Sequence, residues 1–553
     1  MLALAAAATV AGAQDKKMHV SGSVQSDMMI APQTDDAIGA YKDSYDNSSF
    51  LTNTYADVLG QSQFVDFGVR FEFNQHPMPG YQDEYNDFKG WGVPNVWVTG
   101  KTKYVDVTLG SFYEQFGSGF ILRSYEERSL GVDNSLMGVR LSSRPCRGLQ
   151  VKALSGLQRR YWSMSTESVI SGSDLEVALH EMVPGWRENP AARLTLGASW
   201  VNKYENPDEV IMADVSHRLN FPEYVNAFDL RANLGIGNFT ALAEYAVKSD
   251  DPNSLNNFTY KNGTAAMLSM SYAAKGLSVL AQVKRSENMG FRSRRSSSPL
   301  CSAGYINHMP AFTLDHTYSL AALYPYATQV EGEWAFQGGV GYNFKRKTPL
   351  GGKYGTKLKL NYSLVRGLEN DKNKGVRGDD GVENDFFKMG SVYYQDLNLQ
   401  MEKRLTKEFD IHLMYMYQQY NKGIVQSEGG NIYSHIFVAE GKYKFNKKYT
   451  LRGELQTLQT EHESDDWYFA LLELSMAPHF MFSASDQIGR TETTPGVYGD
   501  RTHYFNVGAN YNYKSHRVML SYGRTRAGFN CTGGVCRYVP ASKGLTLNYN
   551  YNF

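Results

Sequence analysis

Short runs in which apolar and polar side chains alternate recur along the whole chain, and they restrict its fold more than any other feature. Three clear runs are 64–74, 504–513 and 545–553. Successive residues of a β-strand point to opposite faces, so each run predicts a strand with one apolar and one hydrophilic face. The apolar members are Val65, Phe67, Val69, Phe71 and Phe73, then Phe505, Val507, Ala509, Tyr511 and Tyr513, then Leu545, Leu547, Tyr549, Tyr551 and Phe553. Runs of about ten residues with this alternation are typical of transmembrane β-barrels.

The residue types on the two faces favour a barrel in a membrane over a soluble β-sandwich. In a sandwich the apolar face is aliphatic and turns toward a dry core. Here many apolar positions near the ends of the runs are Tyr, Phe or Trp, as in the aromatic girdles at lipid interfaces. Charges stand in the middle of the opposite face, which a polar lumen accepts and a dry core does not. We therefore predict that the lumen is faced by Asp66, Arg70, Glu72, Arg452 and Glu454.

The connections between the runs alternate between short and long, as in barrels with short periplasmic turns and long extracellular loops. This rhythm requires one further strand at 51–60. It predicts an all-β, transmembrane, antiparallel up-and-down barrel of about 24 strands, within a range of roughly 18 to 26, with both chain ends in the periplasm. The predicted long loops are 113–134, 203–224, 248–262, 289–330, 366–385, 421–431, 490–502 and 527–540.

Both ends of the chain carry patterns of an exported protein. Residues 1–13 (MLALAAAATVAGA) form an apolar segment that ends in Ala11-Gly12-Ala13, and they predict a signal peptide although the usual basic n-region is missing. At the other end, Tyr549, Tyr551 and Phe553 resemble the insertion signal by which outer-membrane barrels are recognised. We expect a single barrel domain over 14–553 in the bacterial outer membrane, with the barrel-assembly machinery as a transient partner.

Composition excludes two other classes of protein. No stretch of 18 or more apolar residues follows the N-terminus, which excludes a helical membrane protein. Lys and Arg together number 56, as do Asp and Glu, so the basic footprint that a nucleic-acid partner needs is missing.

Two stretches carry a family resemblance. They are 109–141 (LGSFYEQFGSGFILRSYEERSLGVDNSLMGVRL) and 527–542 (AGFNCTGGVCRYVPAS). Both resemble uncharacterised outer-membrane barrel proteins of Bacteroidota that are known only as a domain of unknown function, and the resemblance extends over the whole mature chain. It implies the fold and the location, and it brings no catalytic or binding residues. It also implies that such a barrel can be a subunit of a larger outer-membrane assembly.

Cys531 and Cys536 flank Thr-Gly-Gly-Val in the last long loop. Two cysteines at this spacing around a Gly-Gly turn, in an oxidising compartment, favour a small disulfide-closed loop over a metal site, for which the local sequence offers no further ligands. The predicted topology places Cys146 in a periplasmic turn and Cys301 in an extracellular loop, which argues against their pairing.

The loop 113–134 combines an apolar triplet, 120–122, with closely spaced opposite charges. One interpretation is a segment folded into the lumen, where the charges would narrow the pore and set a transverse field. The alternative, which we favour because surface charges usually mean only solvation, is a salt-bridged hairpin outside the membrane. The candidate constriction residues are Glu114, Arg123, Glu126, Glu127 and Arg128.

Two other long loops carry weaker signals. The loop 289–330 has a basic cluster at 291–296, which could attract anionic solutes or lipopolysaccharide phosphates, followed by apolar and aromatic residues that could fold into the barrel or dock a partner. A solvated loop tip explains it at least as well. The oxygen-rich loop 366–385 could hold calcium, but Gly375 comes one position too early for an EF-hand.

Catalysis finds little support in the sequence. Gly117-Ser118-Gly119 is not a G-x-S-x-G nucleophile elbow, and His180-Glu181 lacks the second His of a zinc helix and lies in a strand pattern. We therefore expect no enzyme and no cofactor. Two functions remain: a porin-like passive channel for small hydrophilic solutes, which base rates for large barrels favour, or a structural or accessory subunit of a multi-protein outer-membrane assembly. For both functions the expected partners are outer-membrane lipid and lipopolysaccharide. A subunit of an assembly would have protein partners as well.

Overall fold

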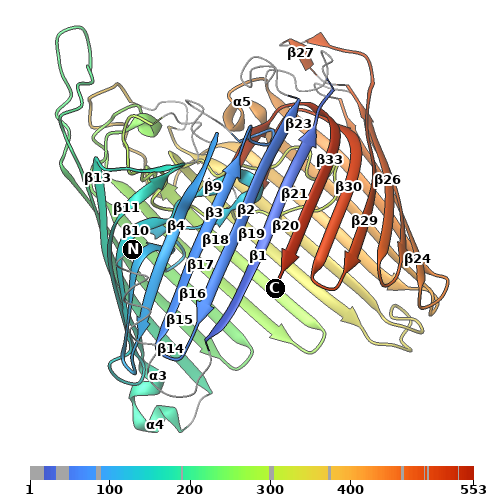
Figure 1. Ribbon diagram of the computed structural model, residues 1–553, viewed down its shortest axis with the longest axis horizontal. Coiled ribbons are helices and arrows are strands. Elements are labelled where there is room, and N and C mark those ends of the chain that lie inside the picture. The colour runs from blue at the N-terminus through green and yellow to red at the C-terminus, as the bar shows by residue number, and fades with distance from the viewer. Residues whose placement is uncertain are drawn as a thin grey trace.

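A computed structural model of the chain describes residues 18–32, 49–81, 89–188, 191–297, 304–370, 375–461, 466–490, 492–494, 497–532 and 535–553. It is a closed antiparallel barrel of 24 strands (Figure 1), which confirms the predicted fold class and strand number. Each strand pairs with the next one along the chain, and the first strand pairs with the last from Ser23↔Asn552 to Ile30↔Leu545. The wall therefore has no free edge among the described strands.

The wall strands follow one another in chain order. They are β1 (His19–Ile30), β2 (Phe50–Gln61), β3 (Val65–Asn74), β4 (Gly90–Lys101), β5 (Val105–Phe112), β10 (Leu136–Ser143), β11 (Leu149–Arg160), β13 (Ser168–Ala178), β14 (Ala192–Glu205), β15 (Tyr224–Ile236), β16 (Phe239–Lys248), β17 (Gly263–Ala274), β18 (Leu277–Glu287), β19 (Gly332–Phe344), β20 (Thr356–Leu368), β21 (Met389–Arg404), β22 (Phe409–Asn421), β23 (Asn431–Lys444), β24 (Tyr449–Thr460), β25 (Trp467–Met476), β26 (Phe480–Gly489), β29 (Thr502–Tyr513), β30 (His516–Thr525) and β33 (Ser542–Asn552). The strand required at 51–60 is β2.

The remaining elements are short and lie in connections. They are β6 (Gln115–Phe116), β7 (Leu122–Arg123), β8 (Glu126–Glu127), β9 (Val132–Asp133), β12 (Ser163–Met164), β27 (Glu492–Thr494), β28 (Val497–Tyr498), β31 (Gly528–Thr532) and β32 (Val535–Val539), with the helices η1 (Arg128–Leu130), α3 (Leu179–Met182), α4 (Pro184–Arg187), η2 (Ser254–Asn256) and α5 (Lys422–Val425). In the part of the chain that the structure describes, no helix is long and apolar enough to cross a membrane.

The two faces of the wall differ as the alternation predicts. On β3, Val69 and Phe71 are exposed on the outside, whereas Arg70 and Glu72 are buried on the face that turns into the barrel. On β24, Leu455 is 65% exposed on the outside, and Glu454 beside it is buried. The outer surface can therefore meet lipid with apolar side chains while polar side chains stay inside.

Connections alternate between a rim of mostly short turns, the turn rim, and a rim of long loops, the loop rim. In Figure 1, α3 and α4 lie at the turn rim, and α5 and β27 at the loop rim. Two turns are longer than expected: 179–191 carries α3 and α4, and 345–355 folds back with Thr348 bridged to Gly352. His180-Glu181 thus lies in a helical turn, and its placement in a strand was wrong, because the strand β13 already ends at Ala178.

The main apolar core of the protein lies inside the barrel. Long loops supply part of it and inward-facing strand residues supply the rest, although we expected a hydrophilic lumen. The buried strand residues of this core include Ile170, Val201, Ala227, Ala246, Ala265, Met267, Ala335, Val365, Met414, Met416, Ile432, Ile436, Val438 and Leu458. The barrel interior is therefore packed across much of its width rather than polar throughout.

Candidate functional site

The connection between β5 and β10, residues 113–135, folds into the barrel, and we call it the first inner loop. Two small hairpins, β6–β7 and β8–β9, shape it. Its apolar triplet Phe120, Ile121 and Leu122 is fully buried in the interior core. The inward-folded alternative therefore describes this loop, and the expectation of an exposed hairpin is wrong. Burying a triplet of this kind removes much apolar surface from water, which outweighs the solvation that the neighbouring charges would gain outside.

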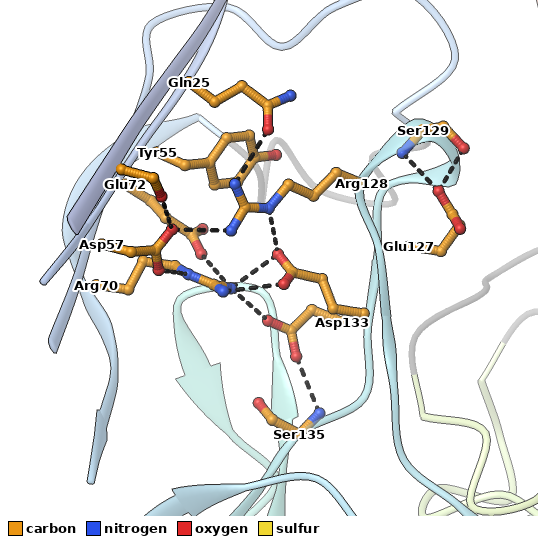
Figure 2. Close-up of polar contacts among 12 residues, drawn as sticks. Gln25, Tyr55, Asp57, Arg70, Glu72, Glu127, Arg128, Ser129, Asp133 and Ser135 are labelled. Atoms are coloured by element: carbon orange, nitrogen blue, oxygen red, sulfur yellow. Dashed lines mark hydrogen bonds and ion pairs between the residues drawn. The ribbon is translucent and has the colours of Figure 1, made fainter. Parts of the chain in front are cut away.

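Arginine side chains from the loop and from the wall hold this loop against β1–β3. Figure 2 shows the guanidinium of Arg128 among Gln25, Tyr55 and Asp57. Arg128 donates to Gln25 Oε1 at 3.1 Å and to Asp57 Oδ2 at 3.0 Å, and it lies 4.4 Å from the centre of the Tyr55 ring. Arg70 of the wall donates to Asp57 Oδ1 at 2.7 Å and to both carboxylate oxygens of Glu126 at 2.8 and 2.9 Å.

A second wall arginine extends this network toward β11. Arg159 donates to Glu72 Oε2 at 2.8 Å and pairs with Asp133, which ends the second small hairpin of the loop. Arg70 lies 3.5 Å from Asp133 as well (Figure 2). Acidic and basic groups alternate from β2 through the loop to β11, so most of these buried charges lie beside a charge of opposite sign. A protein interior tolerates buried charges when they are paired in this way.

Glu114 anchors the start of the first inner loop on the other side. It accepts hydrogen bonds from Arg140 Nε on β10 at 2.6 Å and from Lys152 Nζ on β11 at 2.9 Å. Burial alone raises the pKa of Glu114, but the hydrogen bonds and charges of Lys152 and Arg140 outweigh it and hold the pKa below its usual value. The Glu114 carboxylate is therefore charged in the folded protein at neutral pH.

The tip of the loop reaches β16. Ser118 donates to Glu244 from its backbone N at 2.9 Å and from its hydroxyl at 2.6 Å. Gly117 before it has φ +52°, a left-handed conformation that favours glycine, and a Cβ there would approach Glu244 Oε1 to 2.6 Å. Arg123 lies over the Tyr125 ring at 4.8 Å, and Glu127 caps η1 by accepting from the Ser129 backbone N at 3.2 Å. The five candidate constriction residues thus all lie in the inner loop, and their role as a constriction stays a prediction.

The connection 288–331, which we call the second inner loop, also enters the barrel along its described parts, 288–297 and 304–331. His316 Nε2 lies 2.9 Å from Asp396 Oδ2 on β21, and the Tyr318 hydroxyl lies 2.5 Å from His412 Nδ1 and 3.0 Å from Glu440 Oε2. The backbone N of Leu320 donates to Gln456 on β24 at 2.9 Å. The basic cluster of the second inner loop faces inward in part, because Arg292 and Arg295 are buried and Arg295 pairs with Glu205 at 3.1 Å. Those two arginines are therefore not presented to external phosphates.

Two adjoining cavities lie below the second inner loop, and together we call them the vestibule. The first, of about 960 Å³, has residues 314–318 of this loop in its lining. The second, of about 760 Å³, opens among the turns 275–276 and 345–355. They share Asn343, Lys357, Glu402 and His412 in their linings, so they adjoin each other. The barrel is thus hollow near the turn rim in this sector, and many of the side chains that line the hollow are polar.

The remaining residues that the sequence singled out are charged residues of the wall and the four cysteines. Asp66 pairs with Lys101 at 2.8 Å, and Arg452 pairs with Glu440 at 3.1 Å and with Glu454. A disulfide joins Cys531 and Cys536 at the end of the β31–β32 hairpin. Cys146 is an exposed free thiol on the turn rim, whereas Cys301 lies outside the described residues, as does the predicted signal peptide 1–13.

Phe553 closes the seam of the barrel at the turn rim. Its backbone exchanges two hydrogen bonds of 3.0 Å with Gly22 on β1, and its ring lies where a Cβ of Gly22 would otherwise be. Tyr551 stacks on the ring of His516 at 4.4 Å, and the Tyr549 hydroxyl lies 2.9 Å from His516 Nδ1. The role of these three residues as an insertion signal stays a prediction.

The described part of the chain offers no group of three or more His, Cys, Asp or Glu residues that could hold a metal ion. Asp371 and Asn373 of the suspected calcium loop lie outside that part. Sequence reasoning missed the wall partners that hold the inner loops, above all Asp57, Arg159, Glu244 and Asp396. Their signal was present as charged residues within strands, but nothing in the sequence says which loop each one meets.

The geometry can be compared with known proteins. Residues 1–553 match the model of a family of unknown function, DUF6029. The chain belongs to this family. The match confirms the resemblance to a domain of unknown function, and it assigns no activity to any residue of the inner loops. No curated protein matches the chain.

Solved structures with a similar fold are outer-membrane barrels. They include the P pilus usher PapC translocation pore (9% identity over 97% of this chain and 99% of that chain, TM-score 0.42). They also include the siderophore receptor PirA from Pseudomonas aeruginosa (10% identity, 98% and 81%, TM-score 0.43) and Pseudomonas aeruginosa OpdK with vanillate (11% identity, 73% and 96%, TM-score 0.33). At these identities and TM-scores the likeness concerns the fold and carries no argument about function.

Proposed function

We propose that this protein resides in the bacterial outer membrane, with its turn rim in the periplasm, and acts there as a closed structural or accessory subunit of a multi-protein assembly. The observation that carries the proposal is the apolar core inside the barrel. A passive porin needs a continuous path lined by water. Here the inner loops place apolar side chains in the interior that are at most 1% exposed: Phe120, Ile121 and Leu122 of the first inner loop, and Leu320 and Ala321 of the second.

The cost of opening this core supports a closed resting state. Each large apolar side chain that returns to water costs about 1.5–3 kcal/mol, so exposing the triplet 120–122 costs on the order of 5–9 kcal/mol. The ion pairs of Glu126, Arg128 and Glu114 of the loop with Arg70, Asp57 and Arg140 of the wall would have to break as well. Thermal motion alone therefore opens a path only rarely, and a partner or ligand would be needed to open it more often.

A passive channel for small hydrophilic solutes is the second candidate, and the vestibule favours it. Lys357, Lys359, Asn361 and Gln400 give its wall the character of an aqueous lumen. In this version the inner loops are a gate, and solutes pass when the first inner loop leaves the wall. An enzyme is not proposed, since the polar groups of the interior are used to anchor loops.

Conductance of the purified full chain in planar lipid bilayers separates the two candidates. The matched comparison is a variant in which 115–133 is replaced by a short Gly-Ser linker, so that Glu114 and the wall strands stay. A closed subunit predicts no steady current from the natural chain and a stable open current from the variant. A steady current from the natural chain that corresponds to a conductance of nanosiemens size would refute the closed state. Purification from native membranes in mild detergent then tests the assembly, because a stoichiometric protein companion is expected.

A further inference from the structure

The vestibule carries an excess of positive charge, because its basic residues outnumber its four carboxylates, of which one, Asp315, lines the first cavity. Its second cavity is lined by Lys275, Lys345, Arg346, Lys357, Lys403, Arg404 and Lys442, against Glu402, Asp410 and Glu440. Those basic residues come from the strands and turns between β17 and β23, which form one sector of the barrel.

Each of the three carboxylates is already engaged. Glu402 accepts from Lys357 at 3.1 Å and from Lys359 at 2.8 Å. Asp410 accepts from Arg404 at 2.7 Å and from Lys444 at 3.1 Å. Glu440 pairs with Arg452 at 3.1 Å and accepts from the Tyr318 hydroxyl at 3.0 Å. The acidic groups therefore each serve more than one donor.

Several cations of the vestibule are left without an acidic partner. Within the described residues, no carboxylate pairs with Lys345, Arg346, Lys403 or Lys442, and all but Lys403 are well exposed to solvent. Lys442 belongs to the inward face of β23, two residues beyond Glu440, so its charge lies in the vestibule rather than toward lipid. A hollow lined by one sign of charge concentrates the field and attracts ions of the opposite sign.

The same charge continues from the cavity onto three neighbouring turns. The turns 345–355, 405–408 and 445–448 add Lys347, Lys353, Lys407, Lys447 and Lys448, and Glu408 is their one acidic residue. The positive surface is therefore longer than a single small anion such as phosphate can cover. It suits a ligand that carries many negative charges in a row.

We propose that the vestibule and these three turns bind an acidic polypeptide segment, rich in Asp and Glu, of a periplasmic partner protein. The inference rests on the proposed function, because it takes the turn rim to face the periplasm and the barrel to be a subunit. An extended segment enters the open cavity, its carboxylates meet Lys345, Arg346, Lys403 and Lys442, and the Leu314–Tyr318 stretch of the second inner loop stops it from going further. Lipid headgroups fit less well, since Lys357, Lys359 and Lys442 turn into the barrel.

Binding of a defined probe to the full chain in nanodiscs tests the proposal. The probe is a fluorescent peptide of about twelve residues that alternates Glu and Gly, and the comparison peptide alternates Lys and Gly. We expect fluorescence anisotropy to report binding of the acidic peptide only, and the affinity to fall as salt rises, because exposed charge pairs are screened. Equal binding of the two peptides, or affinity that is independent of salt, would overturn the proposal.

Charge-neutral variants locate the site. The test variant is K345Q/R346Q/K403Q/K442Q, and the matched control, K103Q/R144Q/R147Q/K514Q, removes as many charges from turns elsewhere on the same rim. We expect about tenfold weaker binding of the acidic peptide to the test variant, and a change below about twofold for the control. An equal loss in both variants would show non-specific attraction and refute the site. The shift in gel mobility on heating checks that both barrels are folded.

Two further measurements separate this inference from other ligands and from the proposed function. If millimolar inorganic phosphate displaces the acidic peptide completely, the site binds small anions and the polypeptide proposal fails. If the same displacement needs vesicles of phosphatidylglycerol, a lipid surface is the ligand instead, and the proposal fails too. A steady bilayer current from the natural chain would refute the closed subunit while leaving the location of peptide binding intact.

Discussion

Arg70 is the residue whose replacement tests most directly how the first inner loop is held. Its side chain is 10% exposed, donates to Asp57 and Glu126 at 2.7–2.9 Å, and lies 3.5 Å from Asp133. Arg70→Met keeps the length of the side chain and leaves these carboxylates without their main cation. Breaking a buried pair in this way costs about 3–5 kcal/mol. Asp57 and Glu126 keep some contact with water, so we take the lower end, about 3 kcal/mol, which is roughly a hundredfold in the open-to-closed ratio of the loop.

Amide hydrogen exchange measures this ratio directly. The backbone amides of Ser124, which donates to Glu114 O at 2.9 Å, and of Asn134, which donates to Tyr125 O at 3.0 Å, are protected only while the loop is closed. We expect their exchange to rise about a hundredfold in Arg70→Met, and the double variant R70M/E126Q to recover part of the loss because one uncompensated charge is removed.

Arg452→Met is the matched control for this experiment. Arg452 is also an inward arginine of the wall that pairs with several carboxylates, Glu440, Glu454 and Glu473, but it is linked to the second inner loop through Glu440 and Tyr318. Its replacement should leave the amides of Ser124 and Asn134 as they are. If Arg70→Met forms a folded barrel and its loop amides exchange within about threefold of the natural rate, the ion network does not hold the loop and the reasoning is wrong.

Three further outcomes follow from the same structure. Phe553→Ala should lower the amount of protein in the outer membrane, because it removes the terminal aromatic that lies against Gly22, and normal levels in membrane fractions would contradict the insertion-signal prediction. The double variant C531S/C536S should lower the stability of the β31–β32 hairpin, and of that hairpin alone, by on the order of 2 kcal/mol. We expect faster proteolysis of 527–540 in an otherwise intact barrel, and cleavage at an unchanged rate would contradict this prediction. The lowered pKa of Glu114 means that its stabilising contribution is complete above the unfolded value of about 4.3 and is lost as the pH falls through the folded value. The protection of the Ser124 amide, measured relative to its intrinsic exchange rate at each pH, should therefore fall below about pH 4 in the natural chain and already be low at neutral pH in Glu114→Gln. Protection that stays constant in acid would show that Glu114 is not a determinant.

The wall could be predicted from the sequence because its information is local. On β3, for example, the residues from Val65 to Asn74 specify both faces of a strand with no knowledge of their neighbours. The alternation of short and long connections then gives the strand number and the direction of each strand. Even the extra strand β2, whose pattern is weaker, follows from that rhythm alone.

The inner loops could not be predicted because their positions depend on residues far away in the chain. Glu126 meets Arg70 across 56 positions, and Ser118 meets Glu244 across 126. The one local sign was the apolar triplet 120–122, which is unusual in a loop exposed to water. An apolar stretch between charged residues favours burial. In this loop the burial of the triplet outweighed the solvation of the neighbouring charges, on which the expectation of an exposed hairpin was based.

The seam between β1 and β33 determines when the barrel can close. Asn548 donates to Asp27 at 2.7 Å across this seam, and the two residues are 521 positions apart. The wall therefore keeps two unpaired edges until its last strand has been exported and folded. Both inner loops precede that strand by more than two hundred residues of sequence. Both loops can therefore settle against the wall while it is still an open sheet, and that interval gives a large ligand the widest access to the interior that will enclose it.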